Sequence, residues 1–181
     1  MSRLLLRVER MLRGLTRLSG GLSGLGMVLM ILLVFGNMTA RYLFGSGAVW
    51  LQELELYLLA FTVMTGFAYA MHHDDHVRID VISTYFSRVG KLWLDSLTML
   101  LVAIPTSLLI LFYAWPYMAV SYVRGEGSPN AGGMPWLFLP KAMILVGFAL
   151  VLAEALRQLL SGGRRLVFHY RGPRRRPIVE R

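Results

Sequence analysis

The chain has 181 residues, of which 56% are hydrophobic and only 16% are charged, and its formal net charge is +9. An ordinary soluble domain carries about a quarter charged residues, so this composition argues against a soluble protein and predicts a membrane protein. The basic residues crowd the two ends and one middle loop, which argues against nucleic-acid binding, and the absence of cysteine excludes disulfides and thiolate metal sites.

Residues 1–18 have the pattern of an amphipathic helix. Arginine recurs every three or four residues on one helical face, while leucine and valine occupy the opposite face. Such a helix lies on the membrane surface with its guanidinium groups among lipid phosphates. A signal-peptide n-region is the alternative, but no A-x-A-like site follows the apolar run and Arg41 closes it. We therefore expect an uncleaved interfacial anchor.

Four later segments are long and apolar enough to cross a bilayer. A hydrocarbon core about 30 Å thick needs roughly 20 mostly apolar helical residues. The expected spans are about 22–43, 50–71, 92–115 and 136–156. Pro105, near the middle of the third span, predicts a kink because proline removes a backbone donor. The sequence thus predicts an all-α membrane protein with a four-helix domain over 19–160 and a basic tail over 161–181.

The distribution of lysine and arginine predicts the orientation. Sixteen of the 19 basic residues lie in the N-terminal segment, in the loop after the second span and in the segment from Arg157 to Arg181. The other three are Arg41, Arg124 and Lys141. Because cytoplasmic loops are enriched in Lys and Arg, we expect both termini and the 72–91 loop in the cytoplasm.

The centres of the four spans carry no ionisable side chain. The stretches 23–36, 56–71, 96–114 and 142–153 contain no Asp, Glu, Lys, Arg or His. Ionisable groups inside a membrane usually mark ion pathways and proton relays. Their absence argues that this chain does not form a charged substrate's path by itself.

The segment His72-His73-Asp74-Asp75-His76, with Asp80 close behind, is the main candidate for metal chemistry. These side chains can bind a divalent metal. The run is contiguous, however, and has no i, i+4 ligand pair within a defined helix. A solvated turn, in which Asp74 or Asp75 caps a following surface helix, is the favoured interpretation.

Glu53 and Glu55 lie near the outer end of the second span and point to nearly opposite faces of a helix. Arg41 ends the first span at a similar depth, so an Arg41–Glu53 or Arg41–Glu55 ion pair is one hypothesis. The alternative is that these groups reach the headgroups unpaired. A mildly polar stripe begins at Glu55 and predicts a seam against a partner helix; it continues through Thr62, Gly66 and Tyr69.

Several short motifs occur in a characteristic order. They are Arg41-Tyr42-Leu43-Phe44, Trp50-Leu51-Gln52-Glu53-Leu54 with Tyr57, Gly66 and Tyr69, His76-Val77-Arg78-Ile79-Asp80, Gly125-Glu126-Gly127-Ser128-Pro129, Pro135-Trp136 and Leu139-Pro140. This order, over roughly residues 20–160, resembles the small four-helix membrane subunit of tripartite ATP-independent periplasmic (TRAP) transporters, the DctQ-like family.

The resemblance implies a subunit of the bacterial inner membrane rather than an enzyme, with no catalytic residue, cofactor or metal. Its expected partners are a large multi-span subunit, which the chain would brace during sodium-coupled uptake of an organic acid, a periplasmic solute-binding protein and membrane lipids. The residues expected at the subunit interface or in structural roles are Arg41, Trp50, Glu53, Glu55, His76 and Asp80. The alternative functions are a membrane-embedded metal-dependent enzyme and an independent homo-oligomeric channel.

Overall fold

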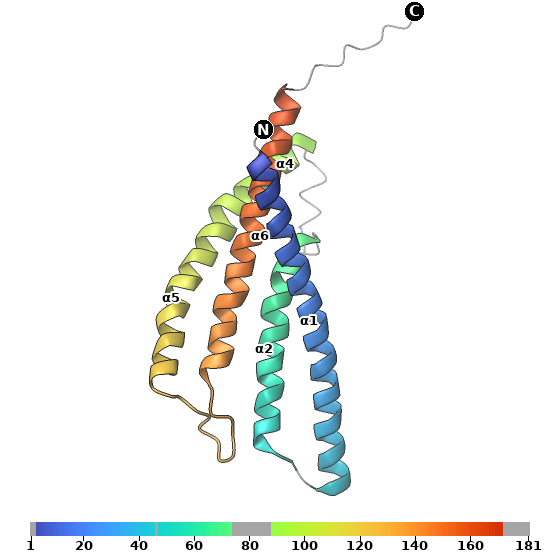
Figure 1. Cartoon of the computed structure of the whole chain (residues 1–181), viewed down its shortest axis with the longest axis vertical. Coiled ribbons are helices and arrows are strands. Elements are labelled where there is room, and N and C mark those ends of the chain that lie inside the picture. Colours follow the sequence, from blue (N-terminus) through green and yellow to red (C-terminus); the bar gives the residue numbers. More distant parts are fainter. Residues whose placement is uncertain (1–2, 46, 74–87, 172–181) are drawn as a thin grey trace, which may run out of the picture.

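The computed structural model describes residues 3–45, 47–73 and 88–171, and within these ranges the chain forms helices and no strand. The elements are α1 (Arg3–Phe44), α2 (Val49–His72), α4 (Arg88–Thr98), η1, a π-helical turn (Met99–Ala103), α5 (Ile104–Val123) and α6 (Phe138–Arg171). Figure 1 shows these helices as an elongated bundle with the N-terminus and the C-terminal end of α6 at the same end.

In the part of the chain that the structure describes, the all-helical prediction is confirmed, and four helical segments there are long and apolar enough to span a membrane. These segments are Leu6–Phe44, Val49–His72, Val89–Val123 and Phe138–Val167. The second span agrees closely with its predicted limits. The fourth helix continues to Arg171, so the first part of the predicted tail is helical.

Residues 3–18 are continuous with the first span and do not form a helix of their own. Helix α1 runs without interruption for 42 residues, or about 63 Å at 1.5 Å per residue. The glycine-rich stretch inside it does not break the helix, because two of its glycines provide close contact with α2. A Cβ atom on Gly20 would lie 2.1 Å from Cδ2 of Tyr69, and one on Gly26 would lie 2.6 Å from Oγ1 of Thr62.

Helix geometry changes at the predicted place in the third span. Pro105 has no N–H, and the π-helical turn η1 ends just before it, with the N–H of Ile104 donating to the carbonyl of Met99 five residues back. A π-turn before a proline shifts the hydrogen-bond register where a donor is missing. The span therefore consists of α4, η1 and α5 in succession.

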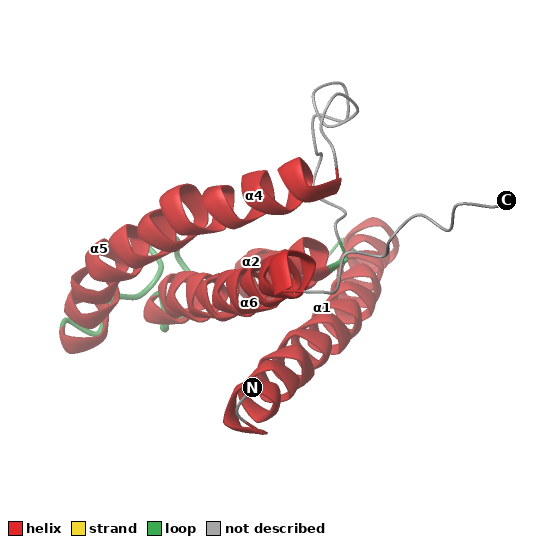
Figure 2. Ribbon diagram, turned by 90° about the horizontal axis from the view of Figure 1, so that it is seen from above, coloured by secondary structure: helices red, strands yellow, loops and turns green. Residues whose placement is uncertain are grey.

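The helices form an open row rather than a closed bundle. Helix α2 packs against α1 and α6, and α6 packs in turn against α5, α4 and η1. Helix α5 makes no comparable contact with α1 or α2 in the described part of the chain. In Figure 2 the α4–α5 segment, the α2–α6 pair and α1 accordingly lie as successive tiers. Helices α2 and α6 are central, and α1 and α5 are peripheral.

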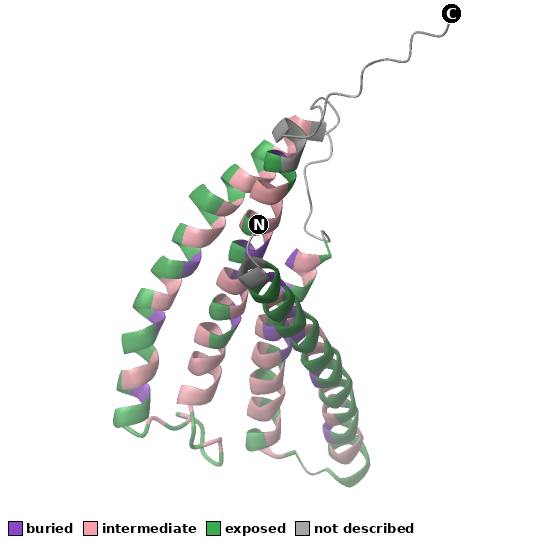
Figure 3. Ribbon diagram, turned by 45° about the horizontal axis from the view of Figure 1, so that its top comes forward, coloured by how far each residue is buried: buried purple, intermediate pink, exposed green. Residues whose placement is uncertain are grey.

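The best-buried apolar contacts lie where α2, α6 and η1 meet. Ala68 and Met71 of α2 pack there against Val151 and Ala155 of α6. Figure 3 shows that exposed residues follow the outward sides of α1 and α5. Large apolar side chains are common among them, such as Phe35 at 70% and Phe112 at 73% exposure. In a bilayer these faces meet lipid or another protein.

Candidate functional site

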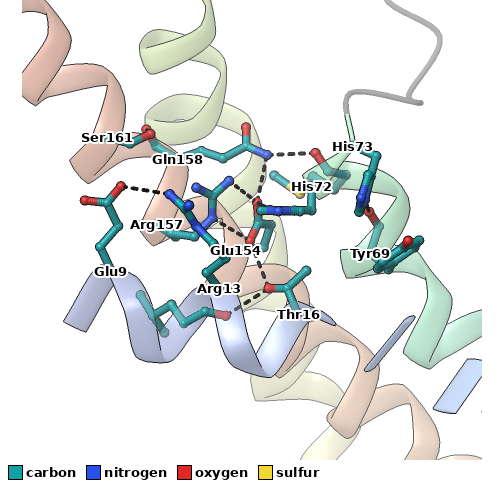
Figure 4. A network of polar contacts seen from close by, with 12 residues as sticks. Glu9, Arg13, Thr16, Tyr69, His72, His73, Glu154, Arg157, Gln158 and Ser161 are labelled. Carbon is teal, nitrogen blue, oxygen red and sulfur yellow. Dashed lines mark hydrogen bonds and ion pairs between the residues drawn. The ribbon is translucent and has the colours of Figure 1, made fainter. Parts of the chain in front are cut away.

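A buried carboxylate joins three helices at the end of the bundle that holds the first turns of α1 and the last turns of α6. Glu154 of α6 is completely buried and accepts hydrogen bonds from Thr16 of α1, His72 of α2 and two residues of its own helix, Arg157 and Gln158. Figure 4 shows these side chains converging on the carboxylate. We call this set of five residues the Glu154 network.

Arg157 supplies the charge that balances Glu154. Its Nε lies 2.9 Å from Oε2 and its Nη2 lies 2.6 Å from Oε1, so the pair is bidentate. The Oγ1 atom of Thr16 lies 2.9 Å from Oε2, and Nδ1 of His72 lies 3.1 Å from Oε1. Because an ionised carboxylate only accepts hydrogen bonds, His72 must carry its proton on Nδ1. An ion pair with saturated hydrogen bonding is the arrangement in which a buried charge is tolerated.

Gln158 extends the network to the backbone of α2. Its Nε2 lies 2.8 Å from the carbonyl oxygen of Met71 and 3.1 Å from Oε1 of Glu154. The carbonyl of Met71 is one of the last in α2, where intrahelical donors run out. This contact fixes the end of α2 against α6.

A second ion pair ties the beginning of α1 to the end of α6. Arg164 donates from Nη1 and Nη2 to the two oxygens of Glu9, at 2.8 and 3.2 Å, and Glu9 is also buried. Arg13 lies 3.5 Å from Glu9 on the other side. The N-terminal turns of α1 are therefore docked on α6 through charged groups.

At the opposite end of the bundle, Glu53 organises the α5–α6 loop (residues 124–137). Glu53 lies in the second turn of α2 and accepts hydrogen bonds from the hydroxyl of Ser128, from Nδ2 of Asn130 at 3.0 Å and from the backbone N–H of Met134 at 2.6 Å. Gly132 in this loop has φ +79°, a backbone conformation that residues with a side chain rarely adopt. We call these four bonded residues the Glu53 network.

The same loop has an ion pair at its base. Nζ of Lys141 lies 2.5 Å from Oε2 of Glu126 and 4.3 Å from the centre of the Tyr117 ring. The Lys141 ammonium holds the pKa of the Glu126 carboxyl below its ordinary value, and the nearby positive charge of Arg124 acts in the same direction. The loop is thus joined to α2 on one side and to α6 on the other.

The polar stripe of the second span lies against α1 of the same chain. Nδ2 of Asn37 lies 2.9 Å from Oε1 of Glu55, and Oγ of Ser23 lies 2.8 Å from the carbonyl oxygen of Thr62. Ser23 also sits 2.6 Å from where a Cβ would be on Gly66. The polar stripe does form a seam with another helix, and that helix is α1 of the same chain.

The predicted site residues are distributed as follows. Neither glutamate pairs with Arg41 within the described ranges, since Glu53 binds the α5–α6 loop and Glu55 binds Asn37. Arg41 and Trp50 are exposed. The predicted junction residues His76 and Asp80 lie outside the described residues.

The predicted metal segment is only partly described. His72 is bound to Glu154, and Nδ1 of His73 lies 3.1 Å from the carbonyl oxygen of Tyr69. Positions 74–80 lie outside the described ranges. Among the residues that the structure describes, no group of three His, Cys, Asp or Glu side chains could hold a metal.

Sequence reasoning missed Glu154 and Glu9, the two carboxylates at the centre of the inter-helix contacts. A signal existed, because Glu154 falls inside the expected span 136–156 and is followed three residues later by Arg157. An ionisable group within a span calls for a partner. Glu9 is the only acidic residue among the arginines of the first 18 positions, which distinguishes it from them.

Four membrane-spanning helices in an open row, with their buried charges paired inside the chain, define a multi-pass membrane protein. A family model described as "Tripartite ATP-independent periplasmic transporters, DctQ component" matches residues 30–165, well over half of the chain. The chain belongs to this family, whose members are components of inner-membrane transporters.

One curated relative is the "C4-dicarboxylate TRAP transporter small permease protein DctQ" of Vibrio cholerae. It is 30% identical to this chain over 89 residues, which cover 49% of the chain and 38% of the relative. The match therefore spans little more than a third of that protein's length. The relative supports the same family assignment as the family model.

Proposed function

We propose that this chain is the small membrane subunit of a TRAP-type transporter and braces a large multi-span subunit. The observation that carries the proposal is that the described carboxylates of the spans are engaged within the chain, while the outward faces of α1 and α5 are broad and apolar. Glu154, Glu9, Glu53 and Glu55 each bind a neighbouring helix or loop of the same chain. The apolar faces of this row of helices offer surface for lipid and for a partner, and the buried ion pairs and hydrogen bonds fix the helices relative to one another.

We infer the position of the partner from the exposed apolar faces of the helices. Helix α2 has α1 on one side and α6 on the other, and it keeps a stripe of about one exposed apolar side chain per turn, formed by Leu56, Leu59, Val63 and Phe67. The outward faces of α1 and α5 expose more large apolar side chains and are the first candidates for the partner. A large membrane subunit would seat against one of these peripheral helices.

The proposed transport cycle follows the family. A periplasmic solute-binding protein would deliver an organic acid, and the large subunit would couple its uptake to sodium. The relative's name refers to C4-dicarboxylates. In this chain, the α5–α6 loop would lie on the periplasmic side, near the docked binding protein.

The proposed orientation places both termini in the cytoplasm. The excess of arginine at the end of the bundle that holds the termini supports it. The exposed arginines of the first turns of α1 would lie among lipid phosphates at that surface. Cysteine labelling from outside intact cells, at position 130 in the α5–α6 loop and at position 10 in α1, separates the two orientations.

Affinity purification of the tagged chain from mild detergent, with mass spectrometry of co-purifying proteins, tests the proposal. A stoichiometric large multi-span protein is the expected result, and deletion of the chain should abolish uptake while that protein is still made. Recovery of the chain alone as a monodisperse homo-oligomer, or normal uptake after the deletion, would refute the subunit role.

Photocrosslinking locates the interface. A photoreactive residue replaces Phe35 on α1 or Phe112 on α5, both strongly exposed, and Ala68, which is fully buried between α2 and α6, serves as the matched control. We expect adducts with the large subunit from one exposed position and none from Ala68. No adduct from either exposed position would contradict a partner on the peripheral helices.

A further inference from the structure

The structure contains a polar cavity of about 340 Å³ beside the Glu154 network. It is bounded by α1, the end of α2, α4 and α6, and its lining includes Arg13, Asp95, Arg157, Ser161 and Arg165. This volume lies near the lower end of the range for small-ligand sites, which begins at about 300 Å³. Figure 4 shows Arg13 of α1 reaching toward Arg157 while Gln158 and Ser161 line the neighbouring part of α6.

We propose that this cavity binds the phosphodiester of a phospholipid headgroup. Guanidinium groups match phosphate oxygens in a planar, bidentate geometry, and basic pockets between membrane helices bind anionic headgroups. Arg157 uses two of its five N–H donors on Glu154, and this bidentate contact holds its guanidinium in place at the wall of the cavity. Arg13 and Arg165 are exposed side chains and can close on a ligand from α1 and α6.

The charge of the site matches a monoanion. The cavity and the ion pairs adjoining it contain four arginines and three carboxylates, namely Arg13, Arg157, Arg164, Arg165, Glu9, Asp95 and Glu154. This set of arginines and carboxylates has one positive charge in excess. A phosphodiester carries one negative charge and balances it, whereas free inorganic phosphate near neutral pH brings more negative charge toward Asp95.

The surroundings favour a lipid as the source of the phosphate. Glu154 and Arg157 lie in the first turn after the uncharged stretch 142–153 of the fourth span, which places the cavity at the depth where the apolar core gives way to headgroups. Across the α4–α6 contact lies an apolar groove lined by Trp93, Leu97, Leu159 and Leu166, where acyl chains can lie beside the protein. Ser96 borders both spaces.

Lipid retention by the full chain tests this proposal. The purified, delipidated protein in a neutral maltoside detergent is titrated with phosphatidylglycerol, and native mass spectrometry counts the lipid molecules bound. The cavity variant is Arg13→Gln with Arg165→Gln. Its matched control is Arg10→Gln with Arg17→Gln, which removes the same charge from exposed positions of α1 outside the cavity lining.

We expect one tightly retained lipid in the native chain and in the control. The dissociation constant should rise at least tenfold in the cavity variant, a change that corresponds to about 1.4 kcal/mol. Equal losses in both variants would mean general attraction to a basic surface and would overturn the proposal. So would the absence of a retained lipid in the native chain, or equal retention of uncharged diacylglycerol.

Two further arms identify the source of the phosphate and guard against misfolding. Millimolar inorganic phosphate should fail to displace the lipid; phosphate binding of equal strength and equal sensitivity to the cavity variant would overturn the lipid assignment. Ser161→Glu places a negative charge in the cavity without removing an arginine, and it should also abolish retention. Normal retention by that variant would refute the site even if the double variant did not fold.

Discussion

Replacing Glu154 by glutamine tests whether the Glu154 network holds the helices together. The change keeps the size of the side chain and removes the charge that balances Arg157, which is itself only 8% exposed. Two of the other donors keep alternative acceptors. The hydroxyl of Thr16 lies 3.1 Å from the carbonyl of Leu12, and Nε2 of Gln158 still reaches the carbonyl of Met71.

The loss therefore comes mainly from a buried arginine without its counter-ion. Removing one partner of a buried ion pair destabilises by about 3–5 kcal/mol. For a chain of this length, such a change lowers the midpoint of thermal unfolding by about 10 °C. Glu55→Gln is the matched control, because it removes the charge of a glutamate whose bond is to a neutral amide, Nδ2 of Asn37; it should destabilise by about 1 kcal/mol.

The assay is thermal unfolding of the purified chain in detergent, followed by tryptophan fluorescence and by loss of the monodisperse chromatographic peak. A double variant, Glu154→Leu with Arg157→Leu, removes both charges and should be markedly more stable than the sum of the two single changes predicts. A shift of less than 2 °C in Glu154→Gln (roughly 1 kcal/mol or less), or a double variant that is strictly additive, would refute the reasoning.

Three further predictions concern other contacts. Gly20→Leu should separate α1 from α2 and lower the unfolding midpoint strongly, because a Cβ there collides with an aromatic ring, while the adjacent Gly21→Leu has open space and should be tolerated; equal effects would disprove the seam. Glu53→Lys should release the α5–α6 loop and raise the rate of amide hydrogen exchange in that loop. It should also weaken assembly with the large subunit more than His72→Ala does. Unchanged loop exchange, or a stronger effect of His72→Ala in a pull-down, would count against this prediction. Because pairing with Lys141 lowers the pKa of Glu126, this contact stabilises the loop above about pH 4.5 and is lost as the pH falls through the lowered value; loop exchange should rise there in the native chain but show no such step in Glu126→Gln.

The four spans could be predicted from sequence because long apolar runs have one favourable solution in a bilayer. Helix ends were harder. The fourth helix continues to Arg171 because Arg164 docks on Glu9, and residues 3–18 continue into the first span because Gly20 and Gly26 fit against α2. Both depend on contacts between distant parts of the chain, which local periodicity does not encode.

The candidate site was predicted less well for the same reason. Glu53 and Glu55 stood out as acids near a span end, but their partners, the α5–α6 loop and Asn37, are fixed by tertiary packing. Glu154 escaped notice because it adjoins an uncharged stretch rather than interrupting it. In the folded chain Glu154 is buried, and its carboxylate links α1, α2 and α6.

The two networks act at opposite ends of the row of helices and constrain different elements. The Glu154 network fixes α1, α2 and α6 relative to one another, and the Glu53 network fixes α2 to the loop that connects α5 with α6. Helix α5 is held mainly by its packing on α6, and it presents most of its other surface outward. If a partner seats on α5, its binding adds the contact that this helix lacks, and the subunit stiffens on assembly; if it seats on α1, it meets a helix already fixed by Glu9, Thr16 and Asn37. A rise in the protection of α5 amides from hydrogen exchange upon assembly would therefore indicate that the partner binds on α5 rather than on α1.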